Sequence, residues 1–162
     1  MINVMFVCLG NICRSPTAHG VFETLVKQQG WGQQIQCYSS GTSAWHIGEA
    51  PDLRATQAAA QSGYQLDHLR AEQINNSTDF AKLDYILAMD NQNLTALQAM
   101  VPADFSGHLS LFLDYHPKAS MREVPDPYFG GEQGFDQVLN LIETASNNLL
   151  AEIIKTHQLS HR

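Results

Sequence analysis

Two residues near the N-terminus, Cys8 and Arg14, have the types and the spacing to attack an oxyanion and to neutralise its charge. A thiolate is a good nucleophile, and the planar guanidinium of arginine matches the oxygens of a phosphate group. Gly10 and Asn11 lie between them, and asparagine tolerates the left-handed backbone of a tight loop. The spacing predicts covalent attack on a tetrahedral oxyanion, with a buried structural cysteine as the alternative for Cys8.

The segments on either side are predicted to place this loop at the start of a helix. Residues 2–7 form a short apolar run that is typical of a buried parallel strand, and a helical repeat of apolar residues begins at Ser15. The loop N–H groups then have no helical partners, and the helix dipole adds positive potential, which favours a bound anion and a thiolate at Cys8. Ser15 is expected at the N-cap with Pro16 at N1, and the Ser15 hydroxyl can also donate towards Cys8.

The rest of the chain alternates between apolar runs and helical repeats. Strands that alternate with helices form parallel sheets with right-handed crossovers. We therefore expect an α/β fold, a three-layer doubly wound sheet of four parallel strands with helices on both faces. Ligands of such sheets bind beyond the carboxyl ends of the strands, where the phosphate-binding loop follows the first strand. The other expected strands are 35–39, 85–89 and 109–112, and a long loop is expected at 115–134. The expected helices are 52–62, 79–82, 91–100 and 135–156, with Asp90 as the cap of the helix 91–100.

Length, charge and cysteine content restrict the class of protein. The 162 residues predict a single domain over 1–162, and the net charge of −7 argues against a nucleic-acid partner. No apolar run reaches the roughly 20 residues of a membrane span, and no signal peptide is recognisable. Three cysteines, none of them in a zinc-binding spacing, predict a reducing, cytoplasmic location without a disulfide framework, metal or cofactor.

Two motifs make this sequence similar to the low-molecular-weight protein tyrosine phosphatases. Residues 8–16 read CLGNICRSP directly after the first strand, and residues 126–128 read DPY. Together with the chain length, the resemblance extends over essentially the whole sequence. It implies the doubly wound fold and a metal-independent protein-tyrosine-phosphatase that hydrolyses phosphotyrosine and small aryl phosphates through a cysteinyl-phosphate intermediate.

Three residues are expected to be catalytic in such an enzyme. Cys8 is the nucleophile, and Arg14 holds the phosphoryl oxygens in the transition state. Asp126 is the general acid that protonates the leaving phenolate and later activates water. Spacing alone would make Asp126 a turn residue, because Asp-Pro is a common turn pair, and the DPY match is what favours the acid.

The loop and an aromatic slot are expected to bind the substrate. Trp45, Tyr128 and Phe129 would wall a deep slot that admits a flat phenyl ring and leaves a short serine phosphate unable to reach the loop. The alternative for Trp45 is a place in the core. His46 lies where family members differ and is expected to tune substrate preference. The loop residues expected at the substrate are Leu9, Gly10, Asn11, Ile12, Cys13 and Ser15.

The resemblance assigns supporting roles to three further side chains. Ser39 and His68 match family positions that help Asn11 to hold the loop in shape. Cys13 lies five residues from Cys8. It either forms a reversible disulfide that shields the nucleophile from over-oxidation or only packs.

Two other functions share parts of this pattern. An arsenate reductase has the same loop and fold, but its chemistry needs a further cysteine pair, and the chain has no cysteine after Cys37. A non-catalytic module would use the loop only to capture phosphorylated partners, and the presence of Cys8, Arg14 and Asp126 together argues against it. The expected partners are phosphotyrosine-containing proteins, with an autophosphorylating tyrosine kinase as one example, and the expected state is a monomer or weak homodimer.

Overall fold

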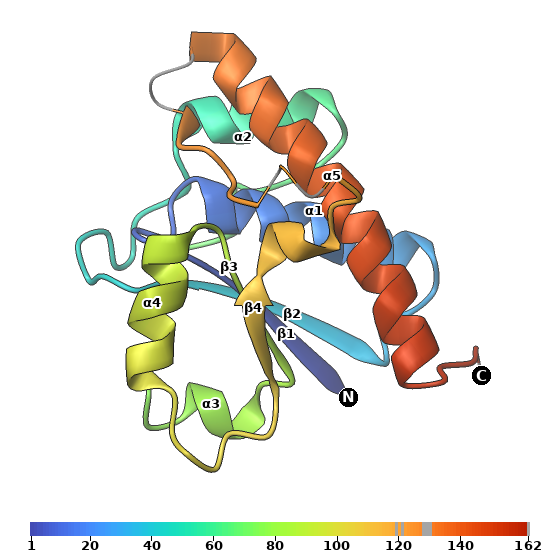
Figure 1. The fold of residues 1–162 in the computed structure, drawn as a ribbon. Helices are drawn as coiled ribbons and strands as arrows, with labels where there is room; N and C mark the ends of the chain where they lie inside the picture. The colour runs from blue at the N-terminus through green and yellow to red at the C-terminus, as the bar shows by residue number, and fades with distance from the viewer. Residues whose placement is uncertain (119, 121, 128–130, 162) are drawn as a thin grey trace.

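The computed structural model describes residues 1–118, 120, 122–127 and 131–161, with the backbone alone at 131 and 132 (Figure 1). Four strands form one parallel sheet in the order β2-β1-β3-β4. The chain winds outward from β1 to β2 and then crosses to β3 and β4, which confirms the predicted doubly wound fold. The strands are β1 (Ile2–Cys8), β2 (Ile35–Gly41), β3 (Tyr85–Ala88) and β4 (His108–Leu111).

Helices cover both faces of the sheet. They are α1 (Arg14–Gln28), α2 (Leu53–Gln61), α3 (Asp79–Lys82), α4 (Asn91–Met100) and α5 (Gly131–Thr156), with a 3-10 turn η1 (Phe112–Tyr115). The helices α1, α2 and α5 pack together on one face, and α4 packs against β3 and β4 from the other (Figure 1). In the described part of the chain, no helix has both the length and the apolar character that crossing a bilayer requires.

The central strand β1 divides its side chains between the two layers. Val4 and Phe6 are buried on the side of α1 and α5, whereas Met5 and Val7 are buried in the layer of α3 and α4. Because successive side chains of a strand point to opposite faces, Cys8 continues the row of Val4 and Phe6 on the α1 side. The packing of β1 therefore fixes where the Cys8 sulfur lies relative to the N-terminus of α1.

Two helices begin earlier than the sequence predicted. The N-cap of α1 is Cys13, so Ser15 lies inside the first turn, and its hydroxyl is directed at Cys8 instead of capping the helix. The helix α5 begins before residue 135, and its first turn contains Gly134. A Cβ at Gly134 would come within 2.9 Å of the carbonyl oxygen of Pro127. This glycine therefore permits the close approach of the first turn of α5 to Pro127. The sequence pattern placed Gly134 in the long loop instead of in the helix.

Glu23 of α1 is expected to make the free energy of unfolding depend on pH in the acidic range. Its carboxylate lies 3.4 Å from His19 Nε2 and 3.4 Å from Lys27 Nζ. The hydrogen bond to His19 is the main cause that lowers the pKa of Glu23 from 4.5 to about 2, against the opposing effect of burial. A carboxylate whose pKa is lowered by folding stabilises the protein above the unfolded pKa, and this stabilisation is lost as the pH falls towards the folded value.

Urea unfolding of the wild type and Glu23→Gln tests this expectation. The wild type should be more stable than the variant at about pH 5, and the difference should shrink at about pH 3. A difference that stays constant between the two pH values would contradict the role of the Glu23 charge.

Candidate active site

The loop after β1 wraps around the sulfur atom of Cys8. The Cys8 residue is 3% exposed, and the backbone N–H of Asn11 donates to Sγ from 3.3 Å. Asn11 has a φ of 56°, a left-handed conformation that asparagine accepts. The start of the loop is held against the end of β2, because the N–H of Thr42 donates to the Cys8 carbonyl at 2.9 Å and the N–H of Ser43 donates to the Leu9 carbonyl at 3.0 Å. The loop backbone is therefore fixed around the sulfur atom.

A buried network behind the loop presents a hydroxyl to Cys8. Ser15 Oγ lies 3.0 Å from Cys8 Sγ and accepts from Asn11 Nδ2 at 2.8 Å. Asn11 Oδ1 accepts the backbone N–H of Glu72 at 2.9 Å. Because Asn11 uses a lone pair of Ser15, the single hydroxyl proton remains for the sulfur atom or for the Ser40 carbonyl at 3.3 Å. A hydroxyl that donates to sulfur stabilises a thiolate more than a thiol.

Two residues that the resemblance assigned to this network lie elsewhere. Ser39 Oγ is 2.9 Å from His19 Nδ1, a residue of α1 one turn beyond the loop. The His68 side chain is 54% exposed, with Nε2 3.9 Å from Glu23. The hydrogen bonds that the Asn11 amide makes here go to Ser15 and to the N–H of Glu72, so support of Asn11 by Ser39 and His68 stays a prediction.

Arg14 points into the molecule. Its side chain is 12% exposed, and Nη1 donates to Asp90 Oδ2 at 2.7 Å and to the Val124 carbonyl at 3.1 Å. Burial alone would lower the pKa of Arg14, but the hydrogen bond with Asp90 and the charge of Cys8 outweigh burial and raise the pKa above its usual value. Because a guanidinium has five N–H donors, bonds at Nη1 hold the orientation of the group while it can still bind phosphoryl oxygens.

Asp90 is a residue of this site that the sequence patterns assigned only to the cap of α4. Its Oδ1 does accept the backbone N–H of Asn93 at 2.8 Å, as that assignment predicted. Its other oxygen reaches Arg14, which was not foreseen. The carboxyl ends of parallel strands meet at one edge of a sheet. An acidic residue directly after the third strand was therefore a usable signal that Asp90 lies beside the loop after the first strand.

A pocket of about 260 Å³ opens above Cys8 and brings together most of the predicted site. Trp45 lies at its rim and is 74% exposed, so the alternative place in the core is wrong. Asn11 and Ser15 are buried behind the loop, and Tyr128 and Phe129 lie outside the described residues. The pocket is lined by Cys8, Leu9, Gly10, Ile12, Cys13, Arg14, Trp45, His46, Asp126 and Pro127.

The other two cysteines have surroundings that disfavour a thiolate. Cys13 packs against Ala55 and Phe135, and burial together with the charge of Cys8 raises the pKa of the Cys13 thiol. Burial is also the main cause that raises the pKa of Cys37. Both side chains are therefore thiols at neutral pH. A reversible disulfide between Cys13 and Cys8 stays a prediction.

Iodoacetate is expected to alkylate Cys8 and to spare the other two cysteines of the folded protein. The reagent is an anion, and a loop at a helix N-terminus that is expected to bind phosphate should also concentrate this anion next to the sulfur of Cys8. Peptide mass mapping after brief treatment should find the carboxymethyl group on Cys8, and added inorganic phosphate should slow its appearance. Equal labelling of Cys8, Cys13 and Cys37 in the folded protein would contradict this assignment.

Comparison with known proteins agrees with this geometry. The family model described as "Low molecular weight phosphotyrosine protein phosphatase" matches residues 3–159. The chain is similar to the low molecular weight protein-tyrosine-phosphatase YfkJ of Bacillus subtilis, with 39% identity over 159 residues that cover 98% of this chain and 100% of the relative. It is also 41% identical over 153 residues to the low molecular weight protein-tyrosine-phosphatase of Streptomyces coelicolor, and the match covers 93% and 92% of the two chains.

Solved structures have the same fold. A protein tyrosine phosphatase from Entamoeba histolytica, with Hepes in its active site, has a TM-score of 0.90 and 35% identity, and the match covers 98% of this chain and 100% of that one. A Drosophila arginine phosphatase has a TM-score of 0.86 and 30% identity, with coverage of 94% and 98%. The phosphatase class that the two motifs predicted is confirmed, and the chain belongs to the low molecular weight phosphotyrosine protein phosphatase family.

Proposed function

We propose that this protein hydrolyses phosphotyrosine by two displacements at phosphorus, with Cys8 as the nucleophile. In the first displacement the sulfur atom bonds to phosphorus, and the bond from phosphorus to the tyrosyl oxygen breaks. Asp126 gives its proton to the leaving oxygen. Arg14 and the loop N–H groups hold the other three phosphoryl oxygens while the charge redistributes.

The second displacement returns the enzyme to its starting state. Asp126, now a carboxylate, takes a proton from a water molecule whose oxygen bonds to phosphorus as the bond between sulfur and phosphorus breaks. The products are inorganic phosphate and the Cys8 thiolate. Ser15 Oγ lies 3.0 Å from the sulfur, so its hydroxyl can stabilise that departing thiolate.

The observation that carries this proposal is the meeting of two distant segments in one pocket. The loop after β1 supplies Cys8 and Arg14, and the segment before α5 supplies Asp126. A non-catalytic phosphate-binding module would need the loop but no carboxyl group opposite the nucleophile. An arsenate reductase would need a further cysteine pair that relays a disulfide outward, whereas Cys13 and Cys37 are both buried and no cysteine follows Cys37.

The pocket walls favour an aryl phosphate as substrate. Leu9, Ile12, Trp45 and Pro127 offer apolar surface to a flat ring, and the sulfur of Cys8 lies at the base of the pocket. A phosphoserine side chain is too short to span such a pocket. We propose phosphotyrosine proteins as substrates, an autophosphorylating tyrosine kinase among them, a cytoplasmic location, and a monomer or weak homodimer as the active form.

Rapid-quench mass spectrometry tests the mechanism. Mixing with 4-nitrophenyl phosphate and quenching within the first turnover should leave a phosphoryl group on the peptide that contains Cys8. Turnover without this intermediate would contradict covalent catalysis. Binding of the aryl phosphate without turnover would mean that the protein is a non-catalytic phosphate-binding module.

A comparison of substrates tests the leaving group. The similarity to an arginine phosphatase makes phosphoarginine the informative competitor. Phosphotyrosine peptides should exceed phosphoserine and phosphoarginine peptides in kcat/KM by roughly 100-fold, as expected where a pocket matches one substrate and excludes the other. A preference for phosphoarginine would overturn the assigned substrate while leaving the mechanism at Cys8 in place.

A further inference from the structure

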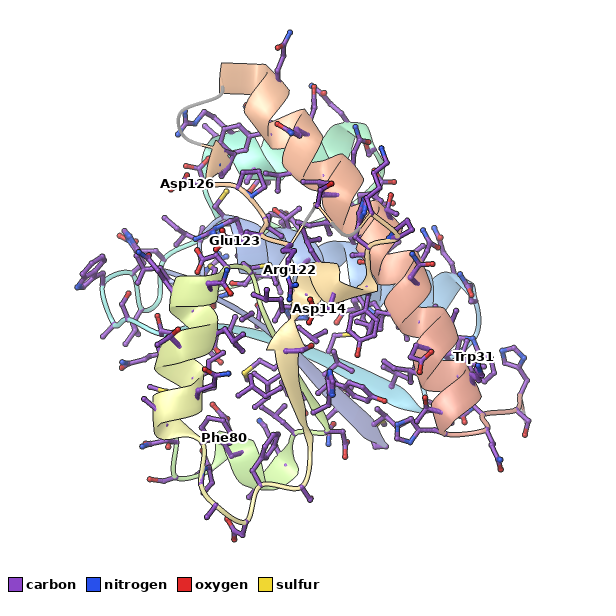
Figure 2. The ribbon with its side chains drawn as sticks, viewed as in Figure 1. Trp31, Phe80, Asp114, Arg122, Glu123 and Asp126 are labelled. Carbon is purple, nitrogen blue, oxygen red and sulfur yellow. The ribbon has the colours of Figure 1, made fainter. Side chains whose placement is uncertain are left out.

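We propose that Glu123 positions the general acid by tying the segment that carries Asp126 to the N-terminus of α4. The inference rests on the proposed function, because it concerns the step that Asp126 performs. Glu123 Oε2 accepts the backbone N–H of Asn91 at 2.8 Å. Figure 2 shows Glu123 close to the upper end of α4, on the path of the chain between Arg122 and Asp126.

The N-terminus of α4 is a suitable anchor for a carboxylate. Asn91 is the first residue of the helix, so its N–H has no partner inside the helix. The positive end of the helix dipole favours a negative charge there. Asp90 caps the N–H of Asn93 with one oxygen and holds Arg14 with the other. The helix end therefore joins the arginine that binds phosphate to the segment that carries the acid.

The residue after Glu123 is fixed at the same place by its backbone. The N–H of Val124 donates to the Met89 carbonyl at 2.8 Å, and the Val124 carbonyl accepts from Arg14 Nη1 at 3.1 Å. The Val124 residue is 1% exposed. Glu123 and Val124 are thus bonded to two segments that also build the phosphate site, the connection 89–91 between β3 and α4 and the start of α1 at Arg14.

The chain between this anchor and the acid is short and stiff. Pro125 and Pro127 flank Asp126, and each proline ring fixes its own φ. Pro127 also restricts Asp126 to an extended backbone. Few torsions remain free between Val124 and Asp126, so a displacement of the anchor moves the acid relative to Cys8. Glu123 is exposed and is not among the pocket-lining residues, so it is a positioning residue that acts through Asp126 and not through contact with the substrate.

The test compares Glu123→Gln and Glu123→Ala with a control at the neighbouring residue. The amide oxygen of glutamine can still accept the Asn91 N–H without charge, whereas alanine removes the bond. Arg122→Ala is the matched control, because Arg122 is the exposed neighbour of Glu123 in the chain. Its Nη2 lies 3.5 Å from Asp114 Oδ1, so its ion pair is made with η1 and not with α4. The measurement is kcat/KM for phenyl phosphate and for 4-nitrophenyl phosphate, whose leaving group is far more acidic and needs less protonation.

A positioning role predicts losses that depend on the leaving group. Glu123→Ala should lower kcat/KM for phenyl phosphate by roughly threefold to tenfold more than for 4-nitrophenyl phosphate, since a charge at a helix N-terminus stabilises by that order. Glu123→Gln should fall between alanine and the wild type. Arg122→Ala should keep the wild-type ratio of the two substrates within about a factor of two, as expected of an exposed ion pair.

Three results separate failure of this proposal from failure of the proposed function. A wild type without turnover would overturn the proposed function. If Asp126→Asn shows the leaving-group dependence and Glu123→Ala keeps the wild-type ratio, Glu123 does not position the acid. Equal losses on both substrates in Glu123→Ala, together with a lower Tm, would show a purely structural role and would also overturn the proposal.

Discussion

Replacing Cys8 with serine is expected to reduce the turnover of aryl phosphates by roughly 10⁵-fold or more, the order seen when an activated nucleophile is removed. The Asn11 N–H and the Ser15 hydroxyl lie against the sulfur atom of Cys8. A serine hydroxyl in that place is a far weaker nucleophile than a cysteine sulfur. No general base lies next to position 8 in the proposed mechanism to activate that hydroxyl. The measurement is kcat for 4-nitrophenyl phosphate with the purified variant.

Binding of inorganic phosphate provides the control for Cys8→Ser. The loop backbone and Arg14 do not depend on sulfur chemistry, so calorimetry should find phosphate affinity within about one order of magnitude of the wild type. Residual turnover above roughly a hundredth of the wild-type rate would mean that another group attacks phosphorus, because removal of a nucleophile costs far more than this. Loss of phosphate binding together with a lower Tm would show that the loop had collapsed.

An Asp126→Asn variant is expected to lower kcat/KM for phenyl phosphate by roughly 10² to 10⁴-fold, the contribution of a positioned general acid. The amide has nearly the same shape as the carboxyl group but cannot give up a proton to the leaving oxygen. The loss should be smaller for 4-nitrophenyl phosphate, whose anion departs more easily. The kcat of both substrates should also fall, because the variant lacks the base that activates water in the second displacement.

The leaving-group comparison also distinguishes the acid from a turn residue. Asp126 lies between two prolines, and its side chain lines the same pocket as Cys8 and Arg14. If its role were only to form the turn, Asp126→Asn would keep the wild-type ratio of kcat/KM for the two substrates. Such a result would refute the assignment of Asp126 as the acid and would leave the nucleophile untested by this variant.

The sequence by itself determined the fold class and the phosphate loop. The fold class follows from the alternation of apolar runs with helical repeats, and the sheet order β2-β1-β3-β4 is the parallel arrangement that such units form. The loop could be predicted because Cys8, Asn11, Arg14 and Ser15 lie within eight consecutive residues. Groups so close in the chain are constrained by local backbone geometry, whatever the rest of the protein does.

Only the tertiary structure decided which distant groups complete the site. Asp90 was expected to cap a helix and also holds Arg14, and Glu123 was not expected to reach Asn91. The Ser39 hydroxyl, which the resemblance assigned to the support of Asn11, lies within hydrogen-bond distance of His19. Several polar side chains at one sheet edge compete for each donor, and differences in packing of about an ångström choose among them because hydrogen bonds weaken steeply with distance and angle. The spacing of these residues along the chain therefore does not determine which of the possible hydrogen bonds forms.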